Sequence, residues 1–197
     1  MSKQLPNSSS LPPGIQRVSR TLKWTGLIGF WLQLITGVVS GVFLVIAAAS
    51  NILAPKQATQ GTEFGIFFAI CALICLGVSI YFYYRYTQIG DLLRNPNAAA
   101  RPKKTDTLKL IKLGRIVNIT GTALSIVGTQ SVVGVILLFK AVVQNPFLGL
   151  GTTNQNATTL VLPADMFNIA ANTATVTAHF TGLLITLWLI DRIEHNN

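Results

Sequence analysis

Four long stretches without a charged residue constrain the fold of this chain more than any other feature. They cover residues 27–53, 64–84, 116–139 and 167–190, and none contains Asp, Glu, Lys or Arg. The hydrocarbon core of a bilayer is about 30 Å thick, and a helix needs roughly 20 mostly apolar residues to cross it. Only 11% of the residues are charged, which is too few for the surface of a typical water-soluble domain. The sequence therefore predicts an all-α integral membrane protein, a bundle of four transmembrane helices.

The segments around these stretches predict one membrane domain preceded by a polar tail. The chain begins with a segment rich in Ser, Pro and Asn that has no signal-peptide pattern, so we expect residues 1–22 to be a disordered tail. Residues 23–192 form the predicted four-span domain. Within it, residues 85–115 form a basic loop between the second and third spans.

The distribution of Lys and Arg predicts the orientation of the helices. Basic residues that flank a span resist translocation, whereas acidic residues have little influence. Most Lys and Arg residues lie in the tail, in the basic loop and after the fourth span, and only Lys56 and Lys140 remain for the opposite side. We therefore expect both termini and the basic loop to be cytoplasmic, with the connections near residues 55–63 and 144–166 outside.

This topology also explains the net charge of +9. The basic residues form no continuous face with interleaved aromatic residues, so no nucleic-acid partner is expected. From Lys103 to Arg115, basic residues alternate with Leu and Ile, which is typical of a segment lying on anionic lipid headgroups. A solvated lead-in to the third helix has the same pattern, and both interpretations stay open.

Aromatic residues cluster near the predicted cytoplasmic interface, where membrane proteins carry an aromatic belt. These residues are Trp24, Tyr81, Phe82, Tyr83, Tyr84, Tyr86 and Trp188. The pattern predicts side chains that face the headgroup region.

Small residues recur at steps of three or four in the first and third spans, which brings them to one face of each helix. Such faces allow close helix contact within lipid. In the first span Gln33 shares its face with the GxxxG pair Gly37 and Gly41, and we expect Gln33 to hydrogen-bond across the bundle. We expect the GxxxG face to support a homo-oligomer or a contact within a larger membrane complex. The stripe of the third span is Gly114, Asn118, Gly121, Ser125 and Gly128.

The fourth span carries a matching row, again at steps of four and three, which we expect to meet the third span inside the bundle. The row is Asn168, Asn172, Thr175, His179, Gly182 and Thr186. Polar side chains at membrane depth are unfavourable unless they are paired or hydrated, so the two spans form a candidate pathway. Its predicted residues are His179, Asn172, Asn168, Thr175, Asn118 and Ser125. The same residues can instead simply join the helices by hydrogen bonds.

His179 is the candidate metal ligand, because imidazole binds transition metals and titrates near neutral pH. A single histidine can also serve as a hydrogen-bonding partner in the core. Cys71 and Cys75 share a helix face and either offer two soft ligands or pack as small apolar residues. Asp165 either attracts cations to an external mouth or favours the start of the fourth helix electrostatically.

The acidic and imidazole groups near the C-terminus, Asp191, Glu194 and His195, either dock a cation or form a solvated helix end. No nucleotide-binding loop, zinc-protease motif, nucleophile elbow or intramembrane carboxylate pair is present in the sequence. We therefore expect no enzyme, and no resident cofactor is predicted.

Short segments of the chain resemble a family of small four-span membrane proteins from cyanobacteria and chloroplasts. They are residues 17–23, the turn Asn145-Pro146-Phe147, and residues 163–167 running into Asn172, Thr173, Ala178, His179 and Phe180. The resemblance extends over about residues 15–192. The family is of uncharacterised-domain type and includes a plant inner-envelope protein described both as an iron permease and as a component of the protein-import translocon.

The resemblance implies a metal-ion permease or transporter subunit, with iron as the transported ion. The alternative is a non-transporting scaffold, translocon or assembly subunit of a larger membrane complex. The sequence has no transit peptide, so the resemblance implies a cyanobacterial plasma or thylakoid membrane rather than a plastid. The lack of a carboxylate within the spans argues against tight binding of a hard cation.

Overall fold

Four long helices make up the structure, a computed structural model that describes residues 11–53, 63–143 and 163–195. They are α1 (Pro13–Leu53), α2 (Glu63–Leu92), α3 (Lys104–Val143) and α4 (Pro163–His195). A short 3-10 helix, η2 (Ala98–Ala100), lies between α2 and α3. The described residues contain no strand, so the predicted all-α fold is confirmed.

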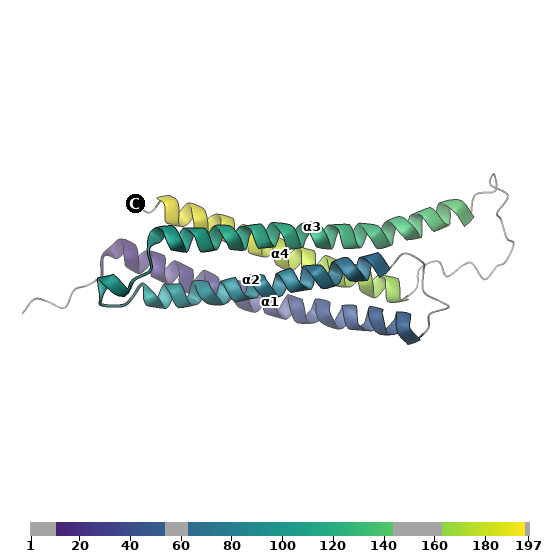
Figure 1. Cartoon of the computed structure of the whole chain (residues 1–197), viewed down its shortest axis with the longest axis horizontal. Coiled ribbons are helices and arrows are strands. Elements are labelled where there is room, and N and C mark those ends of the chain that lie inside the picture. Colours follow the sequence, from purple (N-terminus) through teal and green to yellow (C-terminus); the bar gives the residue numbers. More distant parts are fainter. Residues whose placement is uncertain (1–10, 54–62, 144–162, 196–197) are drawn as a thin grey trace, which may run out of the picture.

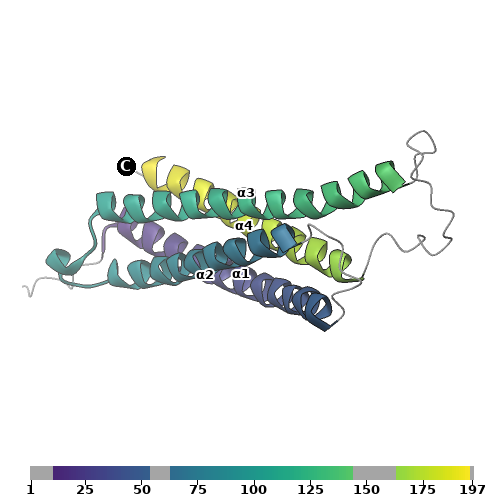
Figure 2. The same cartoon turned by 45° about the vertical axis from the view of Figure 1, so that its right-hand side comes forward.

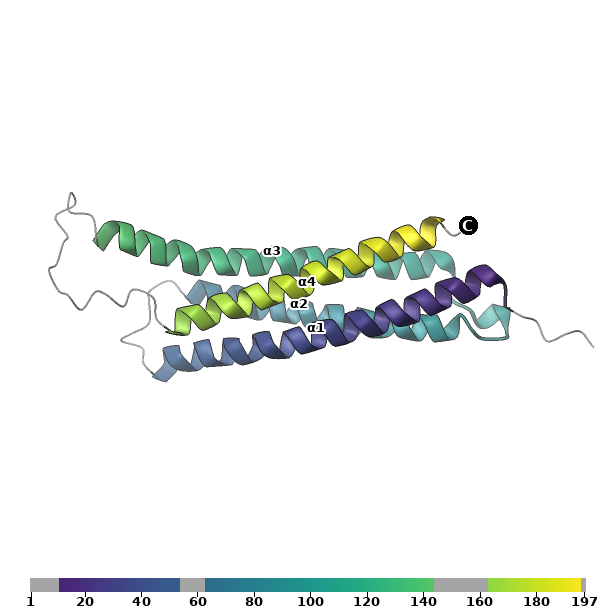
Figure 3. The same ribbon diagram turned by 180° about the vertical axis from the view of Figure 1, so that it is seen from behind.

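The helices form an elongated bundle in which neighbours along the chain run in opposite directions (Figure 1). Each of α1 and α3 packs against both α2 and α4, and α2 also touches α4 across the diagonal. Views from two further directions show the same arrangement (Figures 2 and 3). The starts of α1 and α3 and the ends of α2 and α4 lie together, and we call this the basic end of the bundle.

All four helices are long and apolar enough to cross a membrane. Their outer faces expose large apolar side chains, such as Val45, Phe64, Ile74 and Leu138. Exposure of this extent is unfavourable in water and is expected where lipid is the solvent. The chain is therefore a polytopic integral membrane protein. Its orientation in the bilayer stays a prediction.

The helices continue beyond the uncharged stretches, which corrects two predictions. The predicted tail of residues 1–22 is wrong from Pro13 onward, because α1 begins there, with a residue well suited to a first helical turn. Ser19 is buried, and its hydroxyl donates to the carbonyl of Gly90 over 2.6 Å. The predicted loop of residues 85–115 likewise belongs largely to α2 and α3. Residues 54–62 and 144–162, including Lys56 and the Asn145-Pro146-Phe147 turn, lie outside the described residues.

Part of the predicted aromatic belt belongs to the core instead. Trp24, Tyr81, Tyr84 and Trp188 are exposed as expected. Phe82, Tyr83 and Tyr86 are buried in an apolar cluster with Leu22, Ile111 and Leu189 at the basic end. The reason is helical phase: Tyr83 and Tyr86 continue the buried series Ala72, Leu76 and Ser79 at steps of four and three.

Candidate functional site

Polar side chains line the inner faces of all four helices. We call this set the polar seam: Gln33, Ser40, Ser79, Asn118, Ser125, Asn168, Asn172, Thr175, His179 and Thr186. None of them is more than 1% exposed. The six predicted pathway residues all belong to the seam, which brings them into one column inside the bundle.

Asn118 is the centre of the seam. Its side-chain oxygen accepts hydrogen bonds from Gln33 Nε2 and Ser79 Oγ, both over 3.0 Å. The same oxygen lies 3.1 Å from Nδ1 of His179. Its amide nitrogen donates to the carbonyl of Gly114 over 3.0 Å, which fixes the direction of the side chain. One polar residue from each of the four helices therefore meets at a single oxygen atom.

Both ring nitrogens of His179 face an oxygen atom of a neighbouring helix. Nε2 lies 3.1 Å from the carbonyl oxygen of Ala72, and Nδ1 lies 3.1 Å from the Asn118 oxygen. Because both partners are acceptors and a neutral imidazole carries one N–H group, the ring donates to one of them, and its other nitrogen faces a protein oxygen rather than open space. The ring would have to leave one partner to bind a metal, so the metal role of His179 stays a prediction.

Next to this centre, α1 and α4 are joined by two hydroxyl groups. Ser40 Oγ lies 2.7 Å from Thr175 Oγ1 and donates to the carbonyl of Ala171 over 2.8 Å. In contrast, the hydroxyl of Ser125 donates to Gly121 of its own helix over 2.9 Å. Among the described residues, Ser125 therefore lies in the seam without a hydrogen bond to another helix.

Asn172 and Asn168 form the part of the seam farthest from the basic end. The Asn172 amide nitrogen donates to the side-chain oxygen of Asn168 over 3.0 Å and to the Gly65 carbonyl over 3.3 Å. The side-chain oxygen of Asn172 has no hydrogen-bond partner among the described residues, and neither has that of Gln33. Two buried amide oxygens thus keep unused acceptor capacity at membrane depth.

Glycines make room for the seam side chains. A Cβ at Gly121 would overlap the ring of His179, one at Gly128 would overlap the amide of Asn172, and one at Gly114 would overlap Tyr86. The small-residue stripe of α3 therefore does face the polar row of α4. In α1, Gly37 lies against Leu76 of α2, whereas Gly41 has open space around it. The oligomer contact expected at this GxxxG pair stays a prediction.

The other candidate ligands do not gather into a metal site. Among the described residues there is no group of three or more His, Cys, Asp or Glu side chains that could hold a metal ion. Cys71 and Cys75 are free thiols and half-buried. Glu194 pairs with Lys112 over 3.3 Å, and His195 lies 3.1 Å from Asp191, all on the exposed helix ends. Asp165 is buried in the first turn of α4.

Sequence reasoning missed three polar contributors: Ser40, Ser79 and Tyr83. Ser40 follows Gln33 by one heptad on the same face of α1, and Ser79 and Tyr83 belong to the buried series of α2. Their helical spacing from the other buried residues is the sequence pattern that could have identified them. A lone Ser among apolar residues carries little information, because such a hydroxyl often bonds within its own helix.

Tyr83 ties α2 to α4 and yields a modest prediction. Its hydroxyl donates to the carbonyl of Gly182 over 2.7 Å, and the side chain is fully buried. Tyr83→Phe should therefore lower the free energy of unfolding by about 1 kcal/mol. Tyr84→Phe, at an exposed position of the same helix, is the control. Equal unfolding curves for the two variants in detergent would contradict a stabilising role for this bond.

These features define a class: a polytopic membrane protein built as a four-helix bundle around a buried polar seam. Within this class, the chain belongs to the family described as "Protein of unknown function (DUF3611)", whose model matches residues 12–194. The chain is 31% identical over 187 residues to "Protein TIC 21, chloroplastic" of Arabidopsis thaliana. The alignment covers 93% of this chain and 60% of that relative. No solved structure is significantly similar.

Proposed function

We propose that this chain is a subunit of a membrane permease for a metal ion, with iron as the substrate, and that the polar seam is its pathway. The observation that carries the proposal is the pair of buried amide oxygens of Gln33 and Asn172, which lack a donor among the described residues. A buried acceptor at membrane depth is unfavourable unless water or a cation reaches it. The seam therefore has places where a cation can replace a missing donor.

The ligand chemistry of the seam suits passage rather than tight binding. Amide and hydroxyl oxygens coordinate divalent cations, and neutral ligands hold them more weakly than carboxylates do. Conduction needs sites weak enough to release the ion. Asp165 lies one turn before Asn168 on α4 and adds a buried carboxyl group at the end of the seam, where it would draw cations in.

Iron uptake into proteoliposomes tests the proposal. Asn172→Leu replaces the amide by an apolar group of similar size and should lower the rate of ferrous iron uptake at least about tenfold. The control is Thr177→Ala, because Thr177 lies on the exposed face of α4 and bonds to Thr173 of its own helix over 3.0 Å. Uptake is followed with an iron-quenched dye inside the vesicles.

Two results would count against the proposal. If the wild-type protein moves no more iron than protein-free vesicles, the permease function is wrong. If the wild-type protein transports iron and Asn172→Leu transports it equally well, the pathway is wrong. Thermal unfolding of each variant in detergent separates a lost pathway from a lost fold.

A second function is favoured by the tight closure of the seam. The side chains of His179 and Asn172 fill the spaces left by Gly121 and Gly128, so the seam also fits a purely structural core. The chain would then act as a non-transporting scaffold, translocon or assembly subunit in a larger membrane complex. Stoichiometric protein partners that co-purify in mild detergent, together with no ion flux from the isolated protein, would favour this function.

A further inference from the structure

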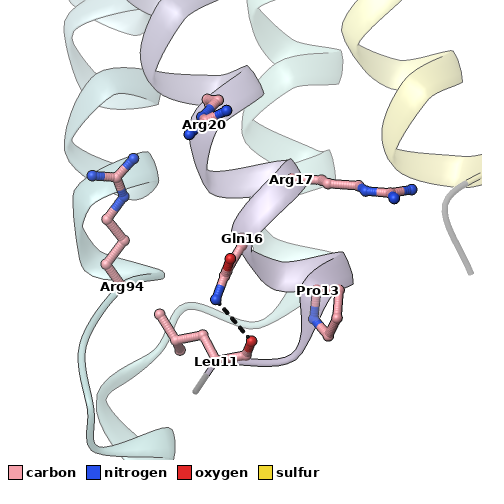
Figure 4. Close-up of a pocket in the computed structure, with 6 residues that line it drawn as sticks. All are labelled: Leu11, Pro13, Gln16, Arg17, Arg20 and Arg94. Carbon is pink, nitrogen blue, oxygen red and sulfur yellow. Dashed lines mark hydrogen bonds between the residues drawn. The ribbon is translucent and has the colours of Figure 1, made fainter.

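A second site lies at the basic end of the bundle, away from the polar seam. An open pocket of about 460 Å³ is lined there by the start of α1 and the segment that follows α2. Figure 4 shows Arg20 and Arg94 on the same side of α1, whereas the side chain of Arg17 extends away from Arg94. A second pocket of about 660 Å³ shares Arg20 and Arg94 and continues along α1 past Lys23, Trp24 and Leu27. The two pockets together form one groove, which we call the arginine groove.

Arg94 is held in place within this groove. Its Nε donates to Ser19 Oγ over 3.1 Å, and Ser19 in turn donates to the Gly90 carbonyl over 2.6 Å. The α1 and α2 backbones are close here, since a Cβ at Gly90 would lie 2.9 Å from the amide nitrogen of Lys23. In the described part of the chain, the two terminal nitrogens of the guanidinium group make no hydrogen bond and can bind a ligand. An arginine oriented in this way is suited to bind phosphate oxygens in a bidentate manner.

The charge of the groove is not neutralised by its own lining. The residues that line the two pockets include Arg17, Arg20, Lys23 and Arg94 and no acidic side chain. The nearby carboxylate of Asp91 is paired with Lys23 over 2.8 Å. Within the described part of the chain, neither Arg17 nor Arg20 has an acidic partner. The groove therefore offers an anion at least the two guanidinium groups of Arg20 and Arg94.

The chemistry of the groove changes along α1 from basic to apolar. Arg17, Arg20, Trp24 and Leu27 follow one another at steps of three, four and three, so they share one helix face. Trp24 is 60% exposed and Leu27 is 41% exposed, and no charged residue follows Lys23 in α1. The guanidinium groups of Arg20 and Arg94 are followed along α1 by an interfacial tryptophan and then by an apolar surface. This order matches a lipid headgroup followed by its acyl chains. A soluble anion has no apolar group that could contact the apolar part of the groove.

We infer that the arginine groove binds an anionic glycerophospholipid, with its phosphate at Arg20 and Arg94 and its acyl chains along Trp24 and Leu27. This site is distinct from a general attraction of basic segments to the membrane surface, because it needs two particular guanidinium groups, one from α1 and one from the segment that follows α2. It is also independent of what the polar seam does.

Native mass spectrometry of the full-length protein in detergent tests the inference. The probes are phosphatidylglycerol and phosphatidylcholine of equal chain length. The wild-type protein should retain one phosphatidylglycerol molecule with an affinity about tenfold above that for phosphatidylcholine. Arg20→Gln combined with Arg94→Gln should remove this preference.

The control carries the same loss of charge elsewhere at the basic end. Arg85→Gln combined with Lys109→Gln changes two exposed residues that line neither pocket and should keep the preference. Equal loss in both double variants would overturn the site, because the attraction would then depend on charge alone. No preference in the wild-type protein would overturn it as well. Unfolding curves in detergent verify that both variants are folded.

Glycerol 3-phosphate and inorganic phosphate distinguish a lipid from a soluble anion. Neither should displace the bound phosphatidylglycerol at millimolar concentration, because both lack the acyl chains that contact Trp24 and Leu27. Displacement by either compound would overturn the assignment to a lipid. Trp24→Ala should weaken the lipid severalfold, and an unchanged affinity in this variant would contradict the placement of the acyl chains.

Discussion

Asn118→Ala is expected to lower the free energy of unfolding in detergent by about 2–3 kcal/mol. The substitution removes the oxygen that accepts from Gln33 and Ser79 and contacts His179. Hydrogen bonds between transmembrane helices contribute about 0.6 kcal/mol each on average, so three lost bonds account for roughly 2 kcal/mol. The donors left without a partner in the core add to this loss. Unfolding followed by circular dichroism during titration with a denaturing detergent measures the change.

Gln130→Ala provides a matched control for this prediction. Gln130 is also an amide on α3, but its side chain is exposed. Its removal should change the stability by no more than about 0.5 kcal/mol. If the two variants unfold alike, the bonds at Asn118 do not stabilise the bundle and the seam is not its polar core.

The Asn118 centre also bears on how the bundle selects one arrangement. Lipid is as apolar as the outer helix faces, so burial of apolar surface does little to choose between helix pairings. The side-chain oxygen of Asn118 contacts one polar group each from α1, α2 and α4, and these contacts form together in one register of the four helices. We therefore expect the seam to define the helix register as well as to add stability.

The helices were predictable because the membrane imposes a simple rule on composition. Uncharged stretches of the required length identify all four, and steps of four and three identify the faces of α3 and α4 that meet. The helix ends were not predictable in this way. Lys23 ends the uncharged stretch of α1, yet the helix continues past it to Pro13, and the side chains of Arg17 and Arg20 in this continuation are exposed. Charge marks the limit of the lipid rather than the limit of the helix.

The seam was predictable only where several polar residues repeat. Asn118 and His179 stand in rows whose spacing is visible in the sequence, so their meeting inside the bundle could be expected. Ser79 is a single hydroxyl in an apolar stripe, and its bond to Asn118 over 3.0 Å depends on the register between α2 and α3. The two unpartnered amide oxygens depend in the same way on packing, because any amide has an acceptor and only the neighbours decide whether it is used.

Gly121→Ala should destabilise the protein by about 1–3 kcal/mol, a large effect for one added methyl group. A Cβ at this position would overlap the ring of His179, and the ring is enclosed because each of its nitrogens lies 3.1 Å from an oxygen of another helix. Gly134→Ala on the same helix is the control, since a Cβ there has open space. Alanine is the better helix former, so the control should instead stabilise α3 by up to about 1 kcal/mol. The same Gly→Ala substitution is therefore expected to change the free energy of unfolding in opposite directions at the two positions.

A double-mutant cycle then shows whether His179 is the cause of the effect. His179→Ala alone removes a buried ring together with its hydrogen bond to a neighbouring helix and should destabilise the bundle. In that background the added methyl group of Gly121→Ala meets a cavity instead of a ring, so its own effect should fall to near zero. The double variant should therefore be more stable, by about 1–3 kcal/mol, than the sum of the two single effects predicts. This coupling is well above the roughly 0.5 kcal/mol expected of independent sites. Additive effects would mean that the ring does not lie over Gly121, and the contact between α3 and α4 at the centre of the seam would have to be rejected.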